Sequence, residues 1–311
     1  MKKLLLILLV TSASCSFSQN MPIGQLNHVD TTRVKNDLFE IVNLEKSRNY
    51  KNIEMLNKVA RYIKSEFEKV CDSVAYQKYN VDNNEYKNVI ASIGMKNKER
   101  IIIGAHYDVF GNQDGADDNA SGVAGLLELA RLLSEEKLAY RIDFVAYTLE
   151  EPPFFRTKEM GSYVHAKYLY DNQIPIKGMI CLETIGYFNE KSNSQAYPIK
   201  GMGLVYGNKG DFITVVQCNK NQPFSDTVKN LMKQQNLIKT KSFKGSSKLS
   251  GVDFSDHMNY WKFDYNAVMI TNTAFYRNKN YHTDKDKLET LDIQKMSLVI
   301  EQLYMTIKQF N

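Results

Sequence analysis

One histidine and several acids crowd into a short connection of this sequence. Between an apolar run and a helical pattern, the stretch Gly104–Leu133 (GAHYDVFGNQDGADDNASGVAGLLELARLL) holds His106, Asp108, Asp114, Asp117 and Asp118. Carboxylates at this spacing repel one another, and their burial is costly unless a positive partner holds them. Histidine combined with carboxylates, without cysteine, is the ligand set of hydrolytic zinc sites. The stretch therefore indicates a metal centre.

Further acids and a second histidine follow other apolar runs. Glu150 and Glu151 end one run, Glu183 lies in IKGMICLETIGY, and His282 lies in YRNKNYHTDKD after the run NAVMITN. In parallel or mixed sheets covered by helices, ligands gather at the carboxyl ends of the strands. We therefore expect these residues to meet His106 at one rim of a sheet. Two metals about 3.5–4 Å apart could share a bridging carboxylate and a bridging water there.

The apolar periodicity predicts the elements that position these residues. Strands are expected over 74–81, 86–94, 100–106, 141–150, 176–187, 211–218 and 266–272. Helices are expected over 32–70 (two helices broken near Arg48–Asn49), 119–133, 161–170, 224–235 and 292–309. Because strands alternate with helices, the pattern predicts an α/β fold with a parallel or mixed sheet covered on both faces. The polar, glycine-containing stretch 186–211 is expected to be an insertion, either a surface excursion or a substrate-contacting loop.

The N-terminus has the three-part pattern of a secretory signal peptide. Met1–Lys3 carries positive charge, Leu4–Val10 is apolar, and small residues follow. The apolar run is shorter than the roughly 18 residues that a bilayer span needs. We expect residues 1–18 to be the signal and 19–311 to be one domain with an N-terminal helical segment. Cys15 in SASC either becomes a lipidated first residue or is discarded, so the protein is expected to be periplasmic, secreted or an outer-membrane lipoprotein.

Composition and charge are those of an ordinary globular domain. The 311 residues are 43% hydrophobic and 24% charged, with a formal net charge of +5. No block of lysine and arginine interleaved with aromatics stands out, so nucleic acid is not an expected partner. The four cysteines are too few for a disulfide scaffold, and free thiols are expected at Cys71, Cys181 and Cys218.

In combination, the motifs of this sequence resemble those of the zinc-dependent aminopeptidases of metallopeptidase family 28, the group of bacterial leucyl aminopeptidase and aminopeptidase S. The motifs are AHYD, GADDNASG, the EE pair, GS downstream and YHTDKD. The resemblance covers the chain from about Tyr86 to the C-terminus. It implies a three-layer α/β/α sandwich of the zinc exopeptidase type, with a central mixed, mostly parallel sheet. It also implies two zinc ions per chain and peptide substrates.

The resemblance also implies a role for each matching residue. His106 resembles a ligand of one metal, Asp118 the bridging carboxylate, and Glu151 and His282 the ligands of the other metal. Glu150 resembles the general base. Glu183 stands where the family usually has aspartate, as the partner of His106. Its longer side chain leaves open how the site would recognise the amino group of a substrate. Tyr281 is either a hydrogen-bond donor to the developing oxyanion or an aromatic packed on the rim.

Residues around this centre are expected to support it. The family pattern implies that Asp108 orients His106 and that the peptide bond between Asp118 and Asn119 is cis. Adjacent strand residues point to opposite faces, so the strand must break before both acids of the EE pair can face the site; Pro152 and Pro153 favour this break. Other expectations concern supporting residues (Asp256 and His257), solvent-facing histidines (His28 and His165) and loop acids (Asp114 and Asp117). For Asp117, a role in packing around the metal centre is the alternative.

The resulting hypothesis is an exported zinc metallo-exopeptidase. It would be an aminopeptidase that hydrolyses N-terminal residues of peptides through a two-metal-activated water, with Glu150 as general base and Tyr281 as a second catalytic residue. A glutaminyl cyclase-like acyltransferase with a single zinc is one alternative. A non-catalytic domain on the same fold is another. The side-chain preference and the choice between amino- and carboxypeptidase activity stay open.

Overall fold

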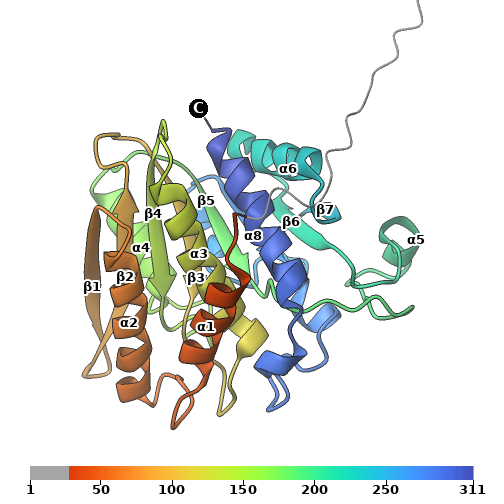
Figure 1. Ribbon diagram of the computed structural model, residues 1–311, viewed down its shortest axis with the longest axis horizontal. Coiled ribbons are helices and arrows are strands. Elements are labelled where there is room, and N and C mark those ends of the chain that lie inside the picture. Colours follow the sequence, from red (N-terminus) through yellow and green to blue (C-terminus); the bar gives the residue numbers. More distant parts are fainter. Residues whose placement is uncertain (1–27, 221, 311) are drawn as a thin grey trace, which may run out of the picture.

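Eight strands form one mixed sheet through the centre of the molecule (Figure 1). The computed structural model describes residues 28–220 and 222–310. The strand order across the sheet is β1-β2-β4-β3-β5-β8-β6-β7, in which β4, β3, β5 and β8 are parallel neighbours. The strands are β1 (Ser73–Val81), β2 (Asn84–Ile93), β3 (Arg100–His106), β4 (Arg141–Tyr147), β5 (Ile176–Glu183), β6 (Ile213–Cys218), β7 (Thr240–Gly245) and β8 (Ala267–Thr271).

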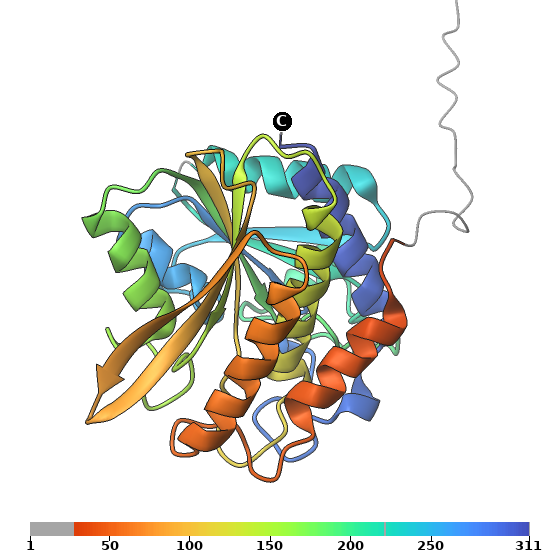
Figure 2. The ribbon, with the colours of Figure 1, turned by 60° about the vertical axis from the view of Figure 1, so that its left-hand side comes forward.

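Helices cover both faces of this sheet (Figure 2). The helices are α1 (Thr31–Val42), α2 (Ile53–Glu68), α3 (Gly122–Ser134), α4 (Gly161–Asp171), α5 (Met202–Tyr206), α6 (Pro223–Gln235), α7 (His257–Lys262) and α8 (Ile293–Lys308). The segment Ala116–Ser121, in which Asp118 and Asn119 have non-helical backbone angles, leads into α3, and two short 3₁₀ helices lie at Ala274–Tyr276 and Leu288–Thr290.

Alternation along the strands divides the core into two layers. Ile101 and Ile103 of β3 point to one face, where they join a cluster with apolar residues of α1, α2, α3, α6 and α8. Ile102 points to the other face and joins residues of α4 and α7. The central strands are buried on both faces, which explains their nearly continuous apolar sequences. The predicted three-layer α/β/α sandwich with a mixed sheet is confirmed.

Most predicted elements are confirmed, with differences at their ends. The two helices that break near Arg48–Asn49 are α1 and α2, and strand β3 has its predicted bounds. Strand β4 ends at Tyr147 rather than at residue 150, and α3 starts at Gly122 rather than at 119. Both differences fall where the chain leaves regular structure to form the site. The sequence pattern missed β7, a polar edge strand, and the helices α5 and α7, which are too short to show a helical period.

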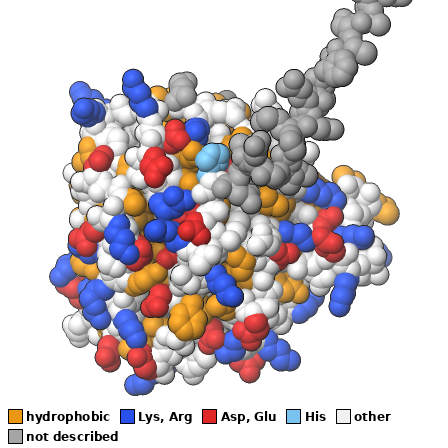
Figure 3. Space-filling view, in the orientation of Figure 1, with side chains coloured by type: hydrophobic (Ala, Val, Ile, Leu, Met, Phe, Trp, Pro, Cys, Tyr) orange, Lys and Arg blue, Asp and Glu red, His pale blue; other side chains and the backbone are white. Residues whose placement is uncertain are grey.

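The described residues bear on some of the remaining expectations. Cys71, Cys181 and Cys218 are free thiols, as expected. Within residues 28–220 and 222–310, no helix is both long and apolar enough to cross a membrane. On the face drawn in Figure 3, lysine and arginine side chains lie among acidic ones instead of forming a single patch. The predicted signal segment 1–18, including Cys15, lies outside the described residues.

Candidate active site

The ends of three neighbouring parallel strands bring predicted site residues together. His106 is the last residue of β3, and Glu183 is the last residue of β5, its neighbour. On the other side of β3, Glu150 and Glu151 follow the end of β4 by three and four residues. Parallel strands end at the same edge of a sheet, so these side chains converge at one rim, as the sequence predicted.

The carboxylate of Asp118 lies between two histidines. Its Oδ1 is 3.3 Å from Nε2 of His106, and its Oδ2 is 3.0 Å from Nε2 of His282. Each histidine also has a carboxylate of its own. Oε2 of Glu183 is 3.3 Å from Nε2 of His106, and Oε2 of Glu151 is 3.2 Å from Nε2 of His282. The five residues thus form two groups of three that share Asp118.

These groups have the donor atoms that a divalent cation needs. One ligand atom each from His106, Asp118 and Glu151 all lie within 4.8 Å of one another. In the described part of the chain, Oδ2 of Asp118, Oε1 of Glu151 and Nε2 of His282 are buried without a hydrogen-bond partner. Buried polar atoms normally have partners, so unpartnered atoms at one point indicate a ligand. Imidazole nitrogens with carboxylate oxygens suit zinc.

The electrostatics of the site also favour a cation. Burial raises the pKa of Glu150 well above its ordinary range. Burial, with the charge of Asp118 adding to it, raises the pKa of Glu151 to about 8. Although burial disfavours the imidazolium, contacts with Asp118 and Glu151 raise the pKa of His282 to about 10. Protons and metal ions compete for the same lone pairs, so acids that bind protons this strongly also favour a divalent cation.

Asp108 holds the two acids that follow β4. Its Oδ1 accepts a hydrogen bond from the backbone N–H of Glu150, and its Oδ2 accepts one from the backbone N–H of Glu151, both at 3.1 Å. Oδ1 also lies 3.6 Å from Nδ1 of His106, the ring that Asp108 was predicted to orient. The strand has ended before this point, and Leu149 has a positive φ of 60°. The predicted break in the strand is therefore confirmed, and Asp108 stabilises the non-strand segment.

A buried arginine fixes the loop between His106 and Asp118. The guanidinium of Arg48, in the segment between α1 and α2, donates hydrogen bonds to the backbone carbonyls of Tyr107, Asp114 and Gly115. Arg48 is only 1% exposed. Its bonds replace the backbone pairing that an irregular buried loop lacks. This role of Arg48 could not be predicted from the sequence, because a lone arginine outside the motif carries no local signal.

Two further acids anchor the segment around Asp118. Both oxygens of Asp286 accept backbone N–H groups, one from Asp117 and one from Asp118. The carboxylate of Asp117 is itself fully buried and accepts hydrogen bonds from Gly186 N, Tyr187 N, Asn272 Nδ2 and Asn278 Nδ2. The peptide bond between Asp118 and Asn119 is cis, as the resemblance implied. Asp286, the last acid of YHTDKD, was also missed, although the motif contained it.

His282 is held between two aromatic rings. Its imidazole is stacked on Tyr281, with 3.9 Å between ring centroids, and on Phe110, with 4.4 Å between centroids. Burial raises the pKa of Tyr281 well above its ordinary range, so the hydroxyl keeps its proton. Tyr281 therefore packs against a predicted ligand and also presents a hydrogen-bond donor at the site.

The other histidines and acids have varied environments. The prediction for His165 is wrong: it is 2% exposed, and its Nδ1 contacts the hydroxyl of Tyr260 at 2.7 Å. His165 lies on α4, which packs against α7. Because α7 has only six residues, it shows no helical period from which this packing could have been predicted. His28 is exposed, as predicted, and contacts Glu301. The remaining residues are a loop acid that pairs with a lysine (Asp114) and two buried supporting residues beside the site (Asp256 and His257).

A cleft of about 420 Å³ opens onto these groups, which is within the usual size of ligand sites. It is lined by Asp118, Glu150, Glu151, Glu183, Tyr281 and His282, with Phe155, Phe254 and Phe275 among the apolar residues. The stretch 186–211, predicted as an insertion, includes α5, which projects from the body (Figure 1). Tyr197, Met202 and Tyr206 from this stretch line a second cavity that adjoins the cleft.

Comparison with known proteins agrees with this geometry. Residues 88–307 match the description "Peptidase family M28". "Uncharacterized protein YfbL" of Escherichia coli (strain K12) is 44% identical over 262 residues, which cover 82% of this chain and 80% of that protein. A "Probable leucine aminopeptidase" of Arthroderma otae is 27% identical over 230 residues. These residues cover 68% of this chain and 54% of that protein, so the chain spans about half the length of this relative.

Solved structures share the fold at low sequence identity. The LapA aminopeptidase of Legionella pneumophila superposes with a TM-score of 0.70 at 20% identity, covering 91% of this chain and 72% of that chain. A glutaminyl cyclase of Bacteroides thetaiotaomicron superposes with a TM-score of 0.66 at 18% identity, covering 90% of this chain and 98% of that chain. Both likenesses concern the fold alone.

Proposed function

The chain belongs to peptidase family M28, and we propose that it is an exported zinc aminopeptidase, which removes N-terminal residues from peptides. One observation carries the proposal. The two oxygens of Asp118 face two different histidines, and each histidine has a carboxylate of its own. A shared carboxylate between two such groups is the arrangement that a pair of metal ions requires.

Two ligand groups follow from the geometry. His106, Asp118 and Glu183 would hold one zinc ion, and Asp118, Glu151 and His282 would hold the other. Zinc held by these residues would lower the pKa of a water molecule from about 15.7 to about 7 and would polarise a peptide carbonyl. Asp108 fixes the backbone of Glu151, and Asp286 fixes that of Asp118, so both ligands are positioned by buried carboxylates.

Glu150 is the general base in this proposal. Its carboxylate lines the cleft, and its Oε2 is 3.9 Å from Nε2 of His106. Burial raises its pKa, so it accepts a proton readily. Glu150 takes one proton from the attacking water and passes it to the leaving nitrogen. The C–N bond breaks, the carbonyl carbon gains the hydroxyl group, and the nitrogen gains the hydrogen, which completes the hydrolysis.

Tyr281 stabilises the charge that develops on the carbonyl oxygen. Its side chain lines the same cleft, and burial keeps its hydroxyl protonated. A donor that is already positioned in a site of low polarity stabilises an oxyanion more strongly than water does. The stacking of Tyr281 on His282 fixes the ring relative to the ligand group.

The test combines a substrate panel, a metal count and one variant. We expect the purified protein to bind two zinc ions per chain, to hydrolyse aminoacyl amides and dipeptides, and to lose this activity with a chelator and regain it with zinc. Glu150→Gln should lower kcat by about 10²–10⁴-fold while zinc content is retained. Glu135→Gln, on an exposed side chain after α3, is the matched control. Unchanged turnover in Glu150→Gln would exclude this mechanism.

The glutaminyl cyclase alternative is separated by the same experiment. That activity releases ammonia from an N-terminal glutamine and forms a ring, without hydrolysis of a peptide bond. One tightly bound zinc per chain, together with cyclisation of glutaminyl peptides, would favour this alternative over the aminopeptidase.

Export is proposed from the sequence of residues 1–18. Fractionation of cells that express the full chain should recover it outside the cytoplasm. A Cys15→Ala variant distinguishes the two fates of Cys15. If Cys15 is lipidated, this variant moves from the membrane fraction to the soluble fraction, and if the signal is cleaved after Cys15, its distribution stays as in the wild type.

A further inference from the structure

The arm formed by residues 196–210 exposes large apolar side chains at its end. Leu204 is 94% exposed, Val205 is 83% exposed and Ile199 is 48% exposed, and these three side chains form the tip of the arm. Leu204 and Val205 lie on α5, which projects from the body, and Figure 3 shows hydrophobic side chains at this projecting end. Single exposed apolar side chains are common on proteins, but neighbouring ones at a projecting tip indicate a contact surface.

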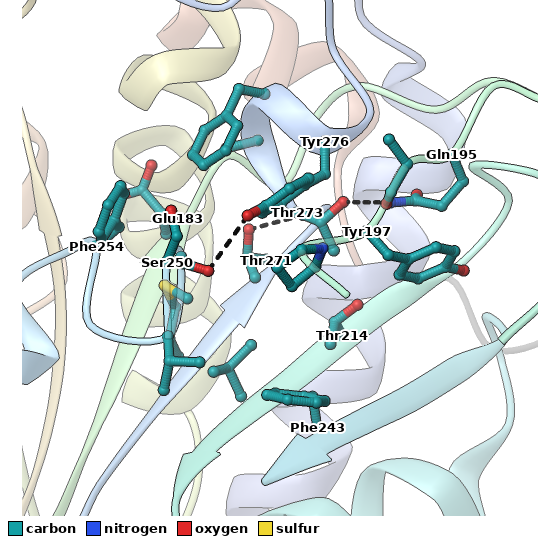
Figure 4. Close-up of a pocket in the computed structure, with 18 of the residues that line it drawn as sticks. Glu183, Gln195, Tyr197, Thr214, Phe243, Ser250, Phe254, Thr271, Thr273 and Tyr276 are labelled. Atoms are coloured by element: carbon teal, nitrogen blue, oxygen red, sulfur yellow. Dashed lines mark hydrogen bonds between the residues drawn. The ribbon is translucent and has the colours of Figure 1, made fainter. Parts of the chain in front are cut away.

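The helix α5 is apolar on both of its sides. Its five residues, MGLVY, include no charged side chain. Met202 and Tyr206 line the second cavity, and Figure 4 shows Tyr197 of the same arm at the end of this cavity away from Glu183. A helix that is apolar on all sides is normally buried. We therefore expect a second apolar medium on the outer side of α5.

Hydrogen bonds fix the base of the arm to the edge strand β7. The hydroxyl of Tyr206 donates to the carbonyl of Ser242 at 3.1 Å, and Nζ of Lys241 donates to the carbonyl of Tyr206. Within the arm, the hydroxyl of Tyr197 donates to the carbonyl of Gly207 at 2.7 Å. The tip is therefore held in a fixed direction by contacts on the inner side of the arm.

The segments around the tip carry the excess positive charge of the protein. Residues 196–210 contain two lysines and no acid, and residues 233–252, which include β7, contain five lysines and no acid. Both segments line the second cavity, so they lie side by side. The whole chain has a formal net charge of +5, so the rest of the chain is slightly acidic. Long-range attraction to an anionic surface would therefore turn this end of the molecule toward it.

The two lysines of the arm have no acidic partner within the described residues. Lys200 lies just before α5 and Lys209 lies shortly after it, and neither forms an ion pair there. By contrast, Lys239 at the start of β7 lies 3.2 Å from Asp211. Apolar side chains flanked by unpaired lysines are typical of surfaces that bind anionic lipid, because the apolar groups enter the acyl region while the ammonium groups stay at the phosphates.

Two other kinds of partner fit the tip less well. A second copy of the chain would bring two basic arms together, and a stable protein interface takes about 20–30 residues from each side. Nucleic acid also attracts lysine, but its unpaired bases stack on aromatic side chains. The tip is aliphatic and small, which suits insertion into a lipid surface.

We propose that the arm docks on the surface of an anionic membrane. Leu204 and Val205 enter the boundary between headgroups and acyl chains, and Lys200 and Lys209 contact lipid phosphates. Peripheral docking of this kind requires no membrane-spanning helix. It is independent of lipidation at Cys15 and of the proposed catalytic activity.

Cosedimentation with vesicles tests the proposal. The full chain carrying Cys15→Ala, which cannot be acylated there, is mixed with vesicles of phosphatidylcholine alone or of equal parts phosphatidylcholine and phosphatidylglycerol. We expect binding to the mixed vesicles to be at least about tenfold stronger. On the mixed vesicles, Leu204→Ser with Val205→Ser should lower the partition coefficient about 100-fold, and Lys200→Gln with Lys209→Gln about tenfold.

The turn between β2 and β3 offers matched controls. Met95, Lys96 and Lys98 are exposed there, so Met95→Ser and the pair Lys96→Gln with Lys98→Gln remove the same kinds of side chain elsewhere. These variants should bind the mixed vesicles as the parent does. All variants share residues 1–27, so any binding by that segment is common to them.

Three results would overturn the proposal. The first is no binding of the parent to the mixed vesicles. The second is parent-like binding by the double serine variant, or an equal loss of binding in Met95→Ser. The third is a dimer of the parent in sedimentation velocity without lipid that dissociates in the double serine variant, which would assign the tip to a second copy. Because no substrate is present, none of these results depends on the aminopeptidase activity.

Discussion

The hydroxyl of Ser255 donates a hydrogen bond of 2.7 Å to Oε2 of Glu183. The same oxygen lies 3.3 Å from Nε2 of His106. Glu183 stands where the resemblance to family 28 implies aspartate, and its longer side chain has one more rotatable bond to be fixed. Ser255 therefore positions the carboxylate at the ligand group, which compensates for the longer side chain.

We expect Ser255→Ala to weaken zinc binding at the group formed by His106, Asp118 and Glu183. Hydrogen bonds that orient a metal ligand are typically worth about 10–100-fold in metal affinity. Competition with a chromophoric chelator measures the two zinc affinities, and only the affinity of the group that contains Glu183 should change. Ser65→Ala, on the exposed face of α2, is the control. Unchanged zinc affinities in Ser255→Ala would show that Glu183 needs no support or is not a ligand.

Asp108→Asn should impair catalysis without changing a proposed ligand. The carboxylate accepts the N–H groups of both Glu150 and Glu151, and an asparagine amide has only one acceptor oxygen for them. Displacement of the general base by about 1 Å costs roughly 10²-fold in rate. We expect kcat/KM to fall by about that factor, measured with the best substrate of the panel. Asp171→Asn, at the exposed end of α4, should retain wild-type kinetics.

The residues at the strand ends could be predicted because strand polarity places them. Once β3 and β5 were recognised as buried parallel strands, His106 and Glu183 had to lie at one edge of the sheet. The structure brings His106, Asp118 and His282 together as the sequence analysis expected. The break after β4 was likewise predictable, since two adjacent acids cannot both face one side of a strand.

The supporting residues could not be predicted, because their contacts are distant in sequence. Arg48 binds carbonyls 59 to 67 residues away, and Asp286 binds amides more than 160 residues away. Such bonds leave no periodic pattern, since they depend on which loops the fold places side by side. His165 was assigned to solvent for the same reason, because its partner Tyr260 is 95 residues away.

Asp117→Ala should destabilise the whole domain. Asp117 is buried, and four groups from three separate segments donate to its carboxylate. Removing the acceptor leaves these buried donors unpartnered, at about 1 kcal/mol or more each. We expect the free energy of unfolding to fall by at least about 3 kcal/mol in urea titrations. Asp114→Ala removes a partly exposed ion pair with Lys287 and should cost less than about 1 kcal/mol.

The carboxyl group of Asp37 makes stability depend on pH. Asp37 lies on α1, is 3% exposed, and accepts a hydrogen bond of 2.6 Å from the hydroxyl of Tyr62. Burial raises its pKa from 3.8 to about 6, although the Tyr62 hydrogen bond opposes the shift. The folded state thus holds this proton more tightly than the unfolded state. The protonated carboxyl group of Asp37 therefore contributes fully to the free energy of unfolding below about pH 4, and this contribution is lost as the pH rises through 6.

Asp37→Asn removes this titration and keeps an acceptor for Tyr62. Above pH 6 the wild type must carry a buried negative charge that the variant lacks, so the variant should be more stable by about 2 kcal/mol at pH 7. Below pH 4 Asp37 is neutral in both states, so the difference should vanish. Urea unfolding followed by circular dichroism at pH 4, 5, 6 and 7 measures it. Glu40→Gln, an exposed position on the same helix, should show no such trend. A variant that is less stable than the wild type at pH 7 would mean that the ionised carboxylate stabilises the fold, contrary to its burial.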